Sequence, residues 1–165
     1  MVRIVRKSMN VIVDLIDDSD TQPTINSAEI QRWIAITLRS INLNTNVSVC
    51  IKLVSQKDAA DLNMQYRNKN SPTNVLSFKS LLPNSFESLL STHHLGDIVI
   101  CPEIVQNEAS EQKKSEVAHY AHLVVHGTLH LNGFKHETID EAQNMEKEEI
   151  KVLEKLGFPN PYLVG

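Results

Sequence analysis

Three histidines in the C-terminal half of the chain have the spacing of a metal site. His126 and His130 are four residues apart, and His136 follows after Gly133. On a helix, residues four apart differ by about 40° around the axis and about 6 Å along it, so both imidazoles can reach one ion. A glycine tolerates positive φ and lets the chain reverse, which would return His136 to the first two histidines. Three neutral nitrogen donors suit zinc, although histidine sites also accept other divalent transition metals, and the spacing therefore predicts a metal site with zinc as the expected ion.

The same expected helix carries two further histidines, His119 and His122, which are alternative candidates for metal ligands. The axial rise from His122 to His130 is about 12 Å, so one ion cannot bind both residues. A lone histidine on a helix is usually a core or surface residue. We therefore interpret His119 and His122, together with His93 and His94, as core or surface residues.

The number of ligands distinguishes a structural metal site from a catalytic one. Structural zinc sites usually have four protein ligands, whereas catalytic sites keep one position for water. No cysteine lies close enough in the sequence to be an obvious fourth ligand, although Cys50 or Cys101 can still fold into place. The three histidines therefore favour an open, catalytic site.

The residue after the first histidine argues against one class of enzyme. The spacing H-x3-H-x5-H is also that of the metzincin peptidases, which carry a glutamate directly after the first histidine as general base. Here that residue is Gly127, so peptidase activity is not favoured. A glycine inside a helix costs about 1 kcal/mol relative to alanine, which indicates close packing against a neighbouring strand.

The elements that must position these residues follow from apolar periodicity and helix caps. Apolar runs predict strands at 10–16, 47–54, 73–78 and 95–101. Capping residues predict helices that begin after Asn26, Ser55, Ser115 and Thr138 and end near residues 41, 67, 132 and 156. A short helix is expected at 103–109, and loops at 17–23 and 80–94. Strands and helices do not alternate strictly, so we predict an α+β fold.

Length and composition indicate one globular domain. The chain has 165 residues, of which 41% are hydrophobic, and domains of roughly 100–200 residues are usual. We interpret 1–9 as an N-terminal extension and 10–165 as the single domain. No segment approaches the roughly 20 apolar residues of a membrane helix, and the basic start lacks the apolar core of a secretory signal. Cys50 and Cys101 are therefore interpreted as reduced thiols of a cytoplasmic protein.

The net charge of −4 is concentrated in one segment. Residues 137–155 contain seven acidic and three basic residues, which gives −4, so the remainder of the chain is neutral. The overall charge therefore argues neither for nor against a nucleic-acid partner.

Four blocks of residues occur in the order seen in a known family. The histidine block has the pattern H-G-x-L-H-L-x-G-x-x-H from His126 to His136. The other blocks are Leu62-Asn63 with Tyr66-Arg67 and 72–78, then 95–100, then Met145 with Glu149. Together they resemble the YbeY family of bacterial rRNA-maturation endoribonucleases. The resemblance extends from about residue 10 to residue 162.

This resemblance implies a fold, an activity and partners. The fold would be a single α+β domain with a small mixed sheet packed with helices. The activity would be a single-strand endoribonuclease that acts in 3′-end maturation of 16S rRNA and in ribosome quality control. One zinc-like ion per chain would be held by His126, His130 and His136. The partners would be ribosomal RNA, the small ribosomal subunit, the GTPase Era and a small-subunit ribosomal protein, with no DNA and no membrane.

The family's important arginine corresponds to Arg67, which with His126 forms the expected catalytic set. A guanidinium can hold two phosphate oxygens at once and stabilise the negative charge that grows on them. Lys69 is expected to bind substrate together with Arg67, and Lys79 would add attraction for the RNA backbone. The alternative for Arg67 is a surface arginine at a helix end. Glu149 either orients a metal-binding histidine or forms a buried ion pair.

The chain departs from the family pattern at two places. The family usually has aspartate where this chain has Asn74, and tyrosine-aspartate where it has Phe134-Lys135. Asn74 removes a negative charge near the expected cleft, and Lys135 reverses one beside the third histidine. With Gly127, these departures motivate a second hypothesis, an RNA-binding ribosome-assembly factor with a structural metal and little catalysis. A metallopeptidase is the third.

Overall fold

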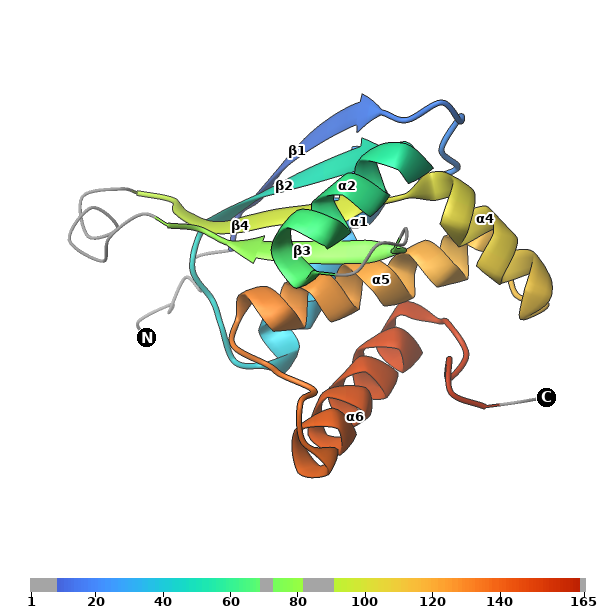
Figure 1. The fold of residues 1–165 in the computed structure, drawn as a ribbon. Helices are drawn as coiled ribbons and strands as arrows, with labels where there is room; N and C mark the ends of the chain where they lie inside the picture. The colour runs from blue at the N-terminus through green and yellow to red at the C-terminus, as the bar shows by residue number, and fades with distance from the viewer. Residues whose placement is uncertain (1–8, 69–72, 82–90, 164–165) are drawn as a thin grey trace, which may run out of the picture.

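The computed structural model describes residues 9–68, 73–81 and 91–163 (Figure 1). Residues 1–8 of the expected N-terminal extension, Lys69 and the centre of the loop expected at 80–94 lie outside these ranges. The elements, in chain order, are β1 (Val11–Asp18), α1 (Ser27–Ser40), β2 (Val47–Val54), α2 (Gln56–Arg67), β3 (Val75–Lys79), β4 (His93–Ile100), α4 (Pro102–Glu111), α5 (Glu116–Leu131) and α6 (Ile139–Leu156).

Four of these helices begin where their capping residues predict. Each cap side chain accepts a hydrogen bond from the backbone N–H three residues later, which satisfies one of the free donors of the first turn. The caps are Asn26, Ser55, Ser115 and Thr138. Helix α4 is longer than the expected 103–109, because it begins at Pro102, whose missing N–H is tolerated in the first turn, and continues to Glu111.

The strands form one mixed sheet in the order β1-β2-β4-β3, which confirms the expected α+β fold. The pairs β1·β2 and β2·β4 are parallel, and β3·β4 is antiparallel. Strand β4 begins at His93 instead of residue 95, because His93 donates its backbone N–H to the Asn46 carbonyl at 2.9 Å. This pairing joins segments far apart in sequence, and no local pattern indicates it.

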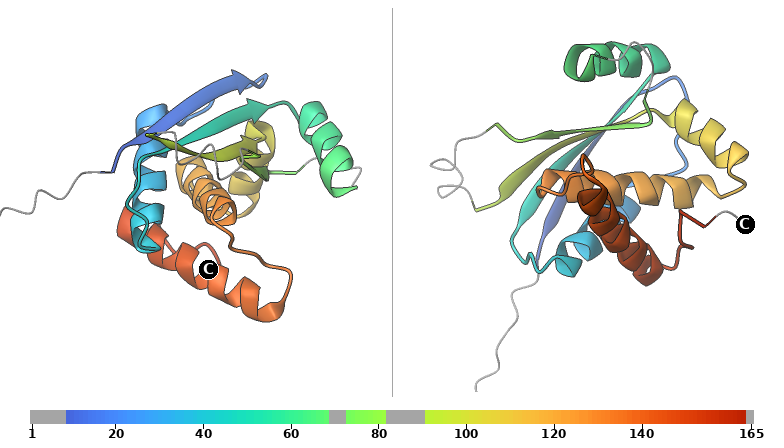
Figure 2. Two further views of the ribbon diagram at one scale, coloured as in Figure 1. Left: turned by 90° about the vertical axis from the view of Figure 1, so that its left-hand side faces the viewer. Right: turned by 60° about the horizontal axis from the view of Figure 1, so that its bottom comes forward.

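Helices cover the two faces of the sheet unequally (Figure 2). Helix α2 lies on one face, where Ala59 and Leu62 pack with Leu76 and Val99. Helices α1, α5 and α6 lie on the other face, and α5 runs between the sheet and α6. The main core lies here, and most of α5 is buried in it. No helix in the described ranges is long and apolar enough to cross a membrane.

Gly127 lets α5 pack closely against the sheet. A Cβ atom at this position would lie 3.0 Å from Cδ1 of Ile98 and 3.1 Å from Oγ of Ser77. These two neighbours belong to β4 and β3, so the expected close packing against a strand is confirmed. The contact occurs one residue after His126, and it therefore holds the predicted metal site close to β3.

Candidate metal centre

Helix α5 and the turn after it bring the three predicted histidines together. His126 and His130 lie one turn apart on α5, and Gly133, with φ +93°, begins the reversal of the chain. The ring of His136 returns to 5.5 Å from that of His126 and 4.7 Å from that of His130, between centroids. One ligand atom from each histidine lies within 4.8 Å of those from the other two. The spacing therefore places three nitrogen donors around one point, as expected.

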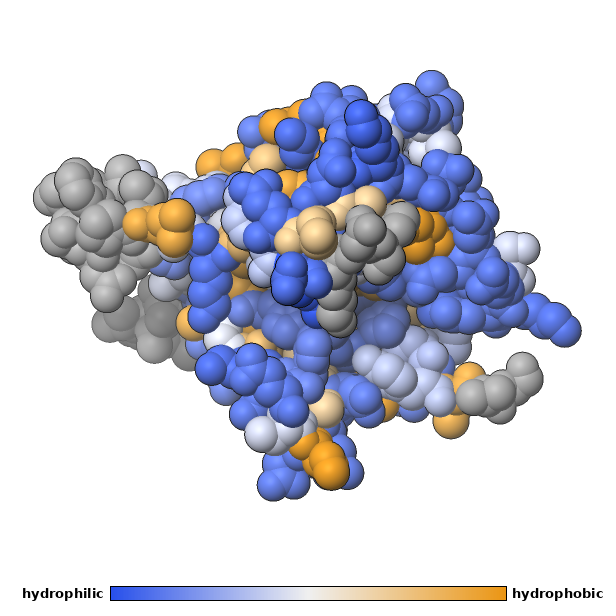
Figure 3. Space-filling model, in the orientation of Figure 1, coloured by the Kyte–Doolittle hydropathy of each residue, from blue (hydrophilic) through white to orange (hydrophobic). Residues whose placement is uncertain are grey.

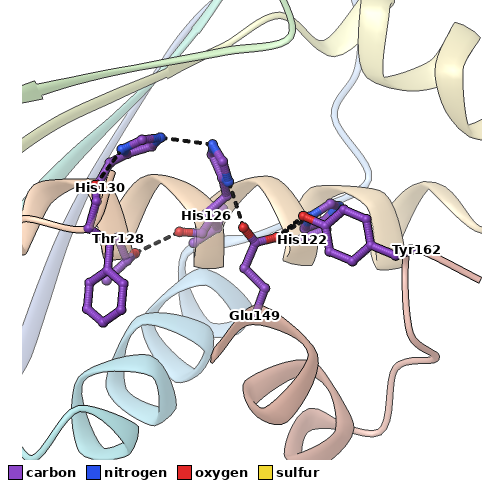
Figure 4. Close-up of polar contacts among 8 residues, drawn as sticks. His122, His126, Thr128, His130, Glu149 and Tyr162 are labelled. Atoms are coloured by element: carbon purple, nitrogen blue, oxygen red, sulfur yellow. Dashed lines mark hydrogen bonds and ion pairs between the residues drawn. The ribbon is translucent and has the colours of Figure 1, made fainter. Parts of the chain in front are cut away.

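The partners of the Nδ1 atoms decide how the first two rings are oriented. Nδ1 of His126 lies 2.8 Å from Oε1 of Glu149 (Figure 4). Nδ1 of His130 lies 2.9 Å from the backbone oxygen of Phe134. A carboxylate and a carbonyl only accept hydrogen bonds, so each Nδ1 carries the hydrogen of its neutral ring. Each Nε2 is then left with a lone pair free to bind a metal.

These two lone pairs face each other. Nε2 of His126 and Nε2 of His130 are 3.0 Å apart. Two lone pairs at this distance repel each other unless a cation lies between them. In a tetrahedral zinc site with Zn–N bonds of 2.0–2.1 Å, two nitrogens are about 3.4 Å apart. The donor set and its spacing therefore fit a zinc-like ion.

Glu149 connects the site to α6. Its side chain is 1% exposed, and Oε2 lies 2.5 Å from Nε2 of His122 and 2.7 Å from the hydroxyl of Tyr162. Burial opposes ionisation of Glu149, but the hydrogen bonds from His122 and His126 outweigh it and lower its pKa to about 2. Glu149 thus holds Nδ1 of a site histidine, as the first of the two expected alternatives describes, and its other carboxylate oxygen is hydrogen bonded to His122 and Tyr162.

Burial also fixes the protonation of His130. Desolvation, followed by the charge of His126, lowers the pKa of His130 to about 4. A neutral imidazole is the form that binds metal.

The remaining histidines of α5 are directed elsewhere. His119 is buried, and its Nε2 lies 3.5 Å from Oε1 of Glu108. Nε2 of His122 is engaged by Glu149 and Tyr162. His119 is therefore a core residue, as expected, whereas His122 has a more specific place beside Glu149 than a core or surface role predicts.

The candidate site has three protein donors. Among the residues that the structure describes, no cysteine or carboxylate joins the histidine group. Cys50 is partly buried and Cys101 is buried, and both are free thiols. The arrangement with three protein donors is the one that leaves a coordination position for water.

A pocket of about 580 Å³ opens beside the histidines. On this face the surface is hollowed, with α2 and β3 on one side of the hollow and α6 on the other, and the residues there are largely hydrophilic (Figure 3). Arg67 lines the pocket together with His126, as do Lys79 and Lys135. Arg67 is the exposed last residue of α2, and it lies at the same pocket as the three histidines, so its position suits the expected role without testing it. Lys69 lies outside the described residues.

The two departures from the family pattern also border this pocket. Asn74 lines it and donates a hydrogen bond from Nδ2 to Oε2 of Glu108 at 3.4 Å. Lys135 lines it next to His136. Neither residue therefore adds a negative charge to the pocket lining, and Lys135 adds a positive one.

Sequence reasoning missed two groups that position the site. Tyr162 hydrogen bonds to Glu149 only because the C-terminal segment folds back onto α5 and α6. Burial and the charge of Glu149 raise the pKa of Tyr162, so its hydroxyl stays a donor. The Phe134 carbonyl is a backbone group, which no residue type reveals. The signal for it was Gly133, since the reversal there turns this carbonyl towards His130.

Comparisons with known proteins agree with this arrangement. A model of the Endoribonuclease YbeY family matches residues 15–157. Endoribonuclease YbeY of Acinetobacter baumannii is 46% identical over 136 residues, which cover 82% of this chain and 86% of the relative. Endoribonuclease YbeY of Nitrosococcus oceani is 46% identical over 135 residues, with coverage of 82% and 86%. That of Xylella fastidiosa is 45% identical over 137 residues, with coverage of 83% and 84%.

A solved structure is also similar in fold. The solution structure of a Thermotoga maritima protein aligns with a TM-score of 0.50 at 23% identity, over 88% of this chain and 92% of that one. At this identity the likeness concerns the fold alone. The family match covers most of the chain, and the curated relatives share nearly half of their residues with it. The chain therefore belongs to the YbeY family of endoribonucleases.

Proposed function

We propose that this protein is a zinc-dependent endoribonuclease that cuts single-stranded RNA in 3′-end maturation of 16S rRNA and in ribosome quality control. The observation that carries the proposal is the shared pocket. It is lined by Arg67 and all three histidines, and so has a candidate metal-binding set beside a guanidinium, which is a group suited to bind phosphate. Membership of an endoribonuclease family supports the choice of RNA as substrate.

In this proposal His126, His130 and His136 hold the ion, and Arg67 holds the phosphate. Zinc, when bound, lowers the pKa of a water in its open position to about 7 and so supplies a nucleophile at neutral pH. The Arg67 guanidinium pairs with two phosphoryl oxygens and stabilises the charge that develops on them. Glu149 keeps the Nδ1 hydrogen on His126, so that Nε2 remains a ligand.

The proposed partners are those that the resemblance to the family implies. They are ribosomal RNA and the small ribosomal subunit, with the GTPase Era and a small-subunit ribosomal protein as protein partners. The proposed location is the cytoplasm, where ribosomes are assembled. Neither DNA nor a membrane has a role in this proposal.

A second candidate function is an RNA-binding assembly factor with a structural metal and little catalysis. Asn74 favours it, since its amide stands where the family has an acid and is hydrogen bonded to Glu108. The three-donor site favours the enzyme, because structural zinc sites usually have four protein ligands.

The test is cleavage of a labelled 16S rRNA precursor by wild type, His126→Ala and Arg67→Ala, each loaded with zinc. We expect no cleavage by His126→Ala, and about a 100-fold slower rate with unchanged zinc content for Arg67→Ala, since a lost transition-state donor typically costs 100- to 1,000-fold. Lys57→Ala, an exposed cation on the same helix, is the matched control and should cut like wild type. Equal cleavage by wild type and His126→Ala would contradict the proposal. A folded, zinc-loaded wild type that binds the precursor without cutting it would favour the assembly factor.

A further inference from the structure

An exposed aromatic side chain stands at the edge of the candidate site. Tyr66 is the penultimate residue of α2, directly before Arg67, and it is 58% exposed. It lines the same pocket as Arg67 and His126. More than half of the Tyr66 side chain is therefore accessible beside the pocket that the three histidines and Arg67 line.

Phe78 holds the Tyr66 ring without covering it. The two ring centroids are 4.8 Å apart, and the ring planes meet at 65° in an edge contact. In such a contact at most one face of Tyr66 is covered by Phe78. Phe78 is itself partly buried in the apolar cluster between α2 and the sheet. Tyr66 is therefore in contact with Phe78 while more than half of its surface stays exposed.

The charges around this ring favour a polyanion. Three of the side chains that line the pocket are cationic, namely Arg67, Lys79 and Lys135, and the one carboxylate among the described lining residues is Glu137. A basic groove with an exposed aromatic ring is the combination that binds single-stranded nucleic acid, because the backbone meets the cations and a base stacks on the ring. A paired base has its faces covered by its neighbours in the duplex and is not available.

We infer that Tyr66 forms a stacking subsite for one unpaired nucleobase next to the phosphate held by Arg67. The inference rests on the proposed function and deepens it, since it gives a structural reason for single-strand preference. Stacking is insensitive to the identity of the base, because every base has a π face. The subsite therefore selects an unpaired nucleotide and not a particular sequence.

The test is binding of a labelled, unstructured 12-nucleotide RNA to the full zinc-loaded chain, followed by fluorescence anisotropy, with RNA integrity checked on a gel. The same sequence as single-stranded DNA and as an RNA duplex forms the other arms. We expect Tyr66→Ala to weaken binding of both single strands about five- to a hundredfold, and duplex binding less than twofold. Tyr66→Phe, which keeps the ring, should stay within about twofold of wild type. Met64→Ala is the matched control, since Met64 is 48% exposed on the same helix and does not line the pocket.

The salt dependence separates stacking from charge. Tyr66→Ala should leave the slope of log affinity against log salt unchanged, whereas Lys79→Ala should reduce it by about one, because only the lysine releases a counterion. Binding by Tyr66→Ala within twofold of wild type, or equal losses for single strands and duplex, would overturn the inference. So would a wild type that binds no single-stranded RNA. A wild type that binds RNA through Tyr66 but does not cut it would overturn the proposed nuclease and leave the stacking subsite supported.

Discussion

Helix α5 carries two pairs of histidines that differ in which ring nitrogen is engaged. In the C-terminal pair, His126 and His130, Nδ1 contacts an acceptor and Nε2 faces the candidate metal position. In the N-terminal pair, His119 and His122, Nε2 itself lies next to a carboxylate, at 3.5 Å and 2.5 Å. The residue type and the helix are the same. The acceptors that other elements bring to each ring therefore decide which pair can bind metal.

The largest expected effect is the loss of a ligand from the C-terminal pair. His130→Ala should lower zinc affinity by more than about 100-fold, which exceeds the 10- to 100-fold typical of residues that only orient a ligand. His119→Ala, from the N-terminal pair, should keep wild-type zinc affinity. The measurement is zinc binding in competition with a chromophoric chelator, with circular dichroism to confirm folding. Equal losses in the two variants would remove the distinction between the pairs.

Glu149 contacts one member of each pair, so changing it sharpens the comparison. Glu149→Gln keeps the shape but loses the charge that holds the Nδ1 hydrogen on His126. We expect zinc affinity to fall about 10- to 100-fold. Glu154→Gln, an exposed position on the same helix, is the matched control and should bind zinc like wild type. Wild-type affinity in Glu149→Gln would show that the carboxylate serves the fold and not the metal site.

The smallest expected effect concerns stability and the N-terminal pair. Burial, and then the charge of Lys114, lowers the pKa of His119 to about 4, although Glu108 opposes this shift. Between pH 6.5 and 4 the unfolded chain therefore binds a proton that folded His119 does not, and the folded state loses stability as pH falls. The loss from His119 amounts to about 2 kcal/mol between pH 7 and 5.

Urea unfolding of chelator-treated protein at pH 7 and pH 5 measures this contribution. His119→Leu should lose about 2 kcal/mol less than wild type over the interval. Titration of Glu149 does not affect this difference. Its pKa is about 2, so its contribution to the free energy of unfolding changes mainly below pH 5. Identical pH dependence in wild type and His119→Leu would contradict the assignment of His119 as a neutral core residue.

The sequence predicts well those features that depend on residues close together in the chain. Helix caps, the span of α5 and the convergence of three histidines depend on residues within one or two turns, where spacing determines geometry. Gly127 is also a local signal: a glycine inside a helix lowers helix stability relative to alanine, which indicates close packing at that position.

The remaining features depend on contacts between distant segments. Glu149 could be placed on a buried stripe of its helix, but its partners follow from how α6 packs on α5. Tyr162 reaches Glu149 only through the return of the C-terminal segment. The early start of β4 at His93 depends likewise on pairing with the segment that leads into β2. Such contacts carry no periodic or capping signal.

Whether the three histidines bind a metal ion is tested by an anomalous difference map at the zinc edge from crystals grown with zinc. If the C-terminal pair and His136 bind zinc, we expect one peak about 2.1 Å from Nε2 of His126, from Nε2 of His130 and from one ring nitrogen of His136. A peak between His119 and His122 instead, or no peak at the three histidines, would contradict the assignment of His126, His130 and His136 as the metal ligands.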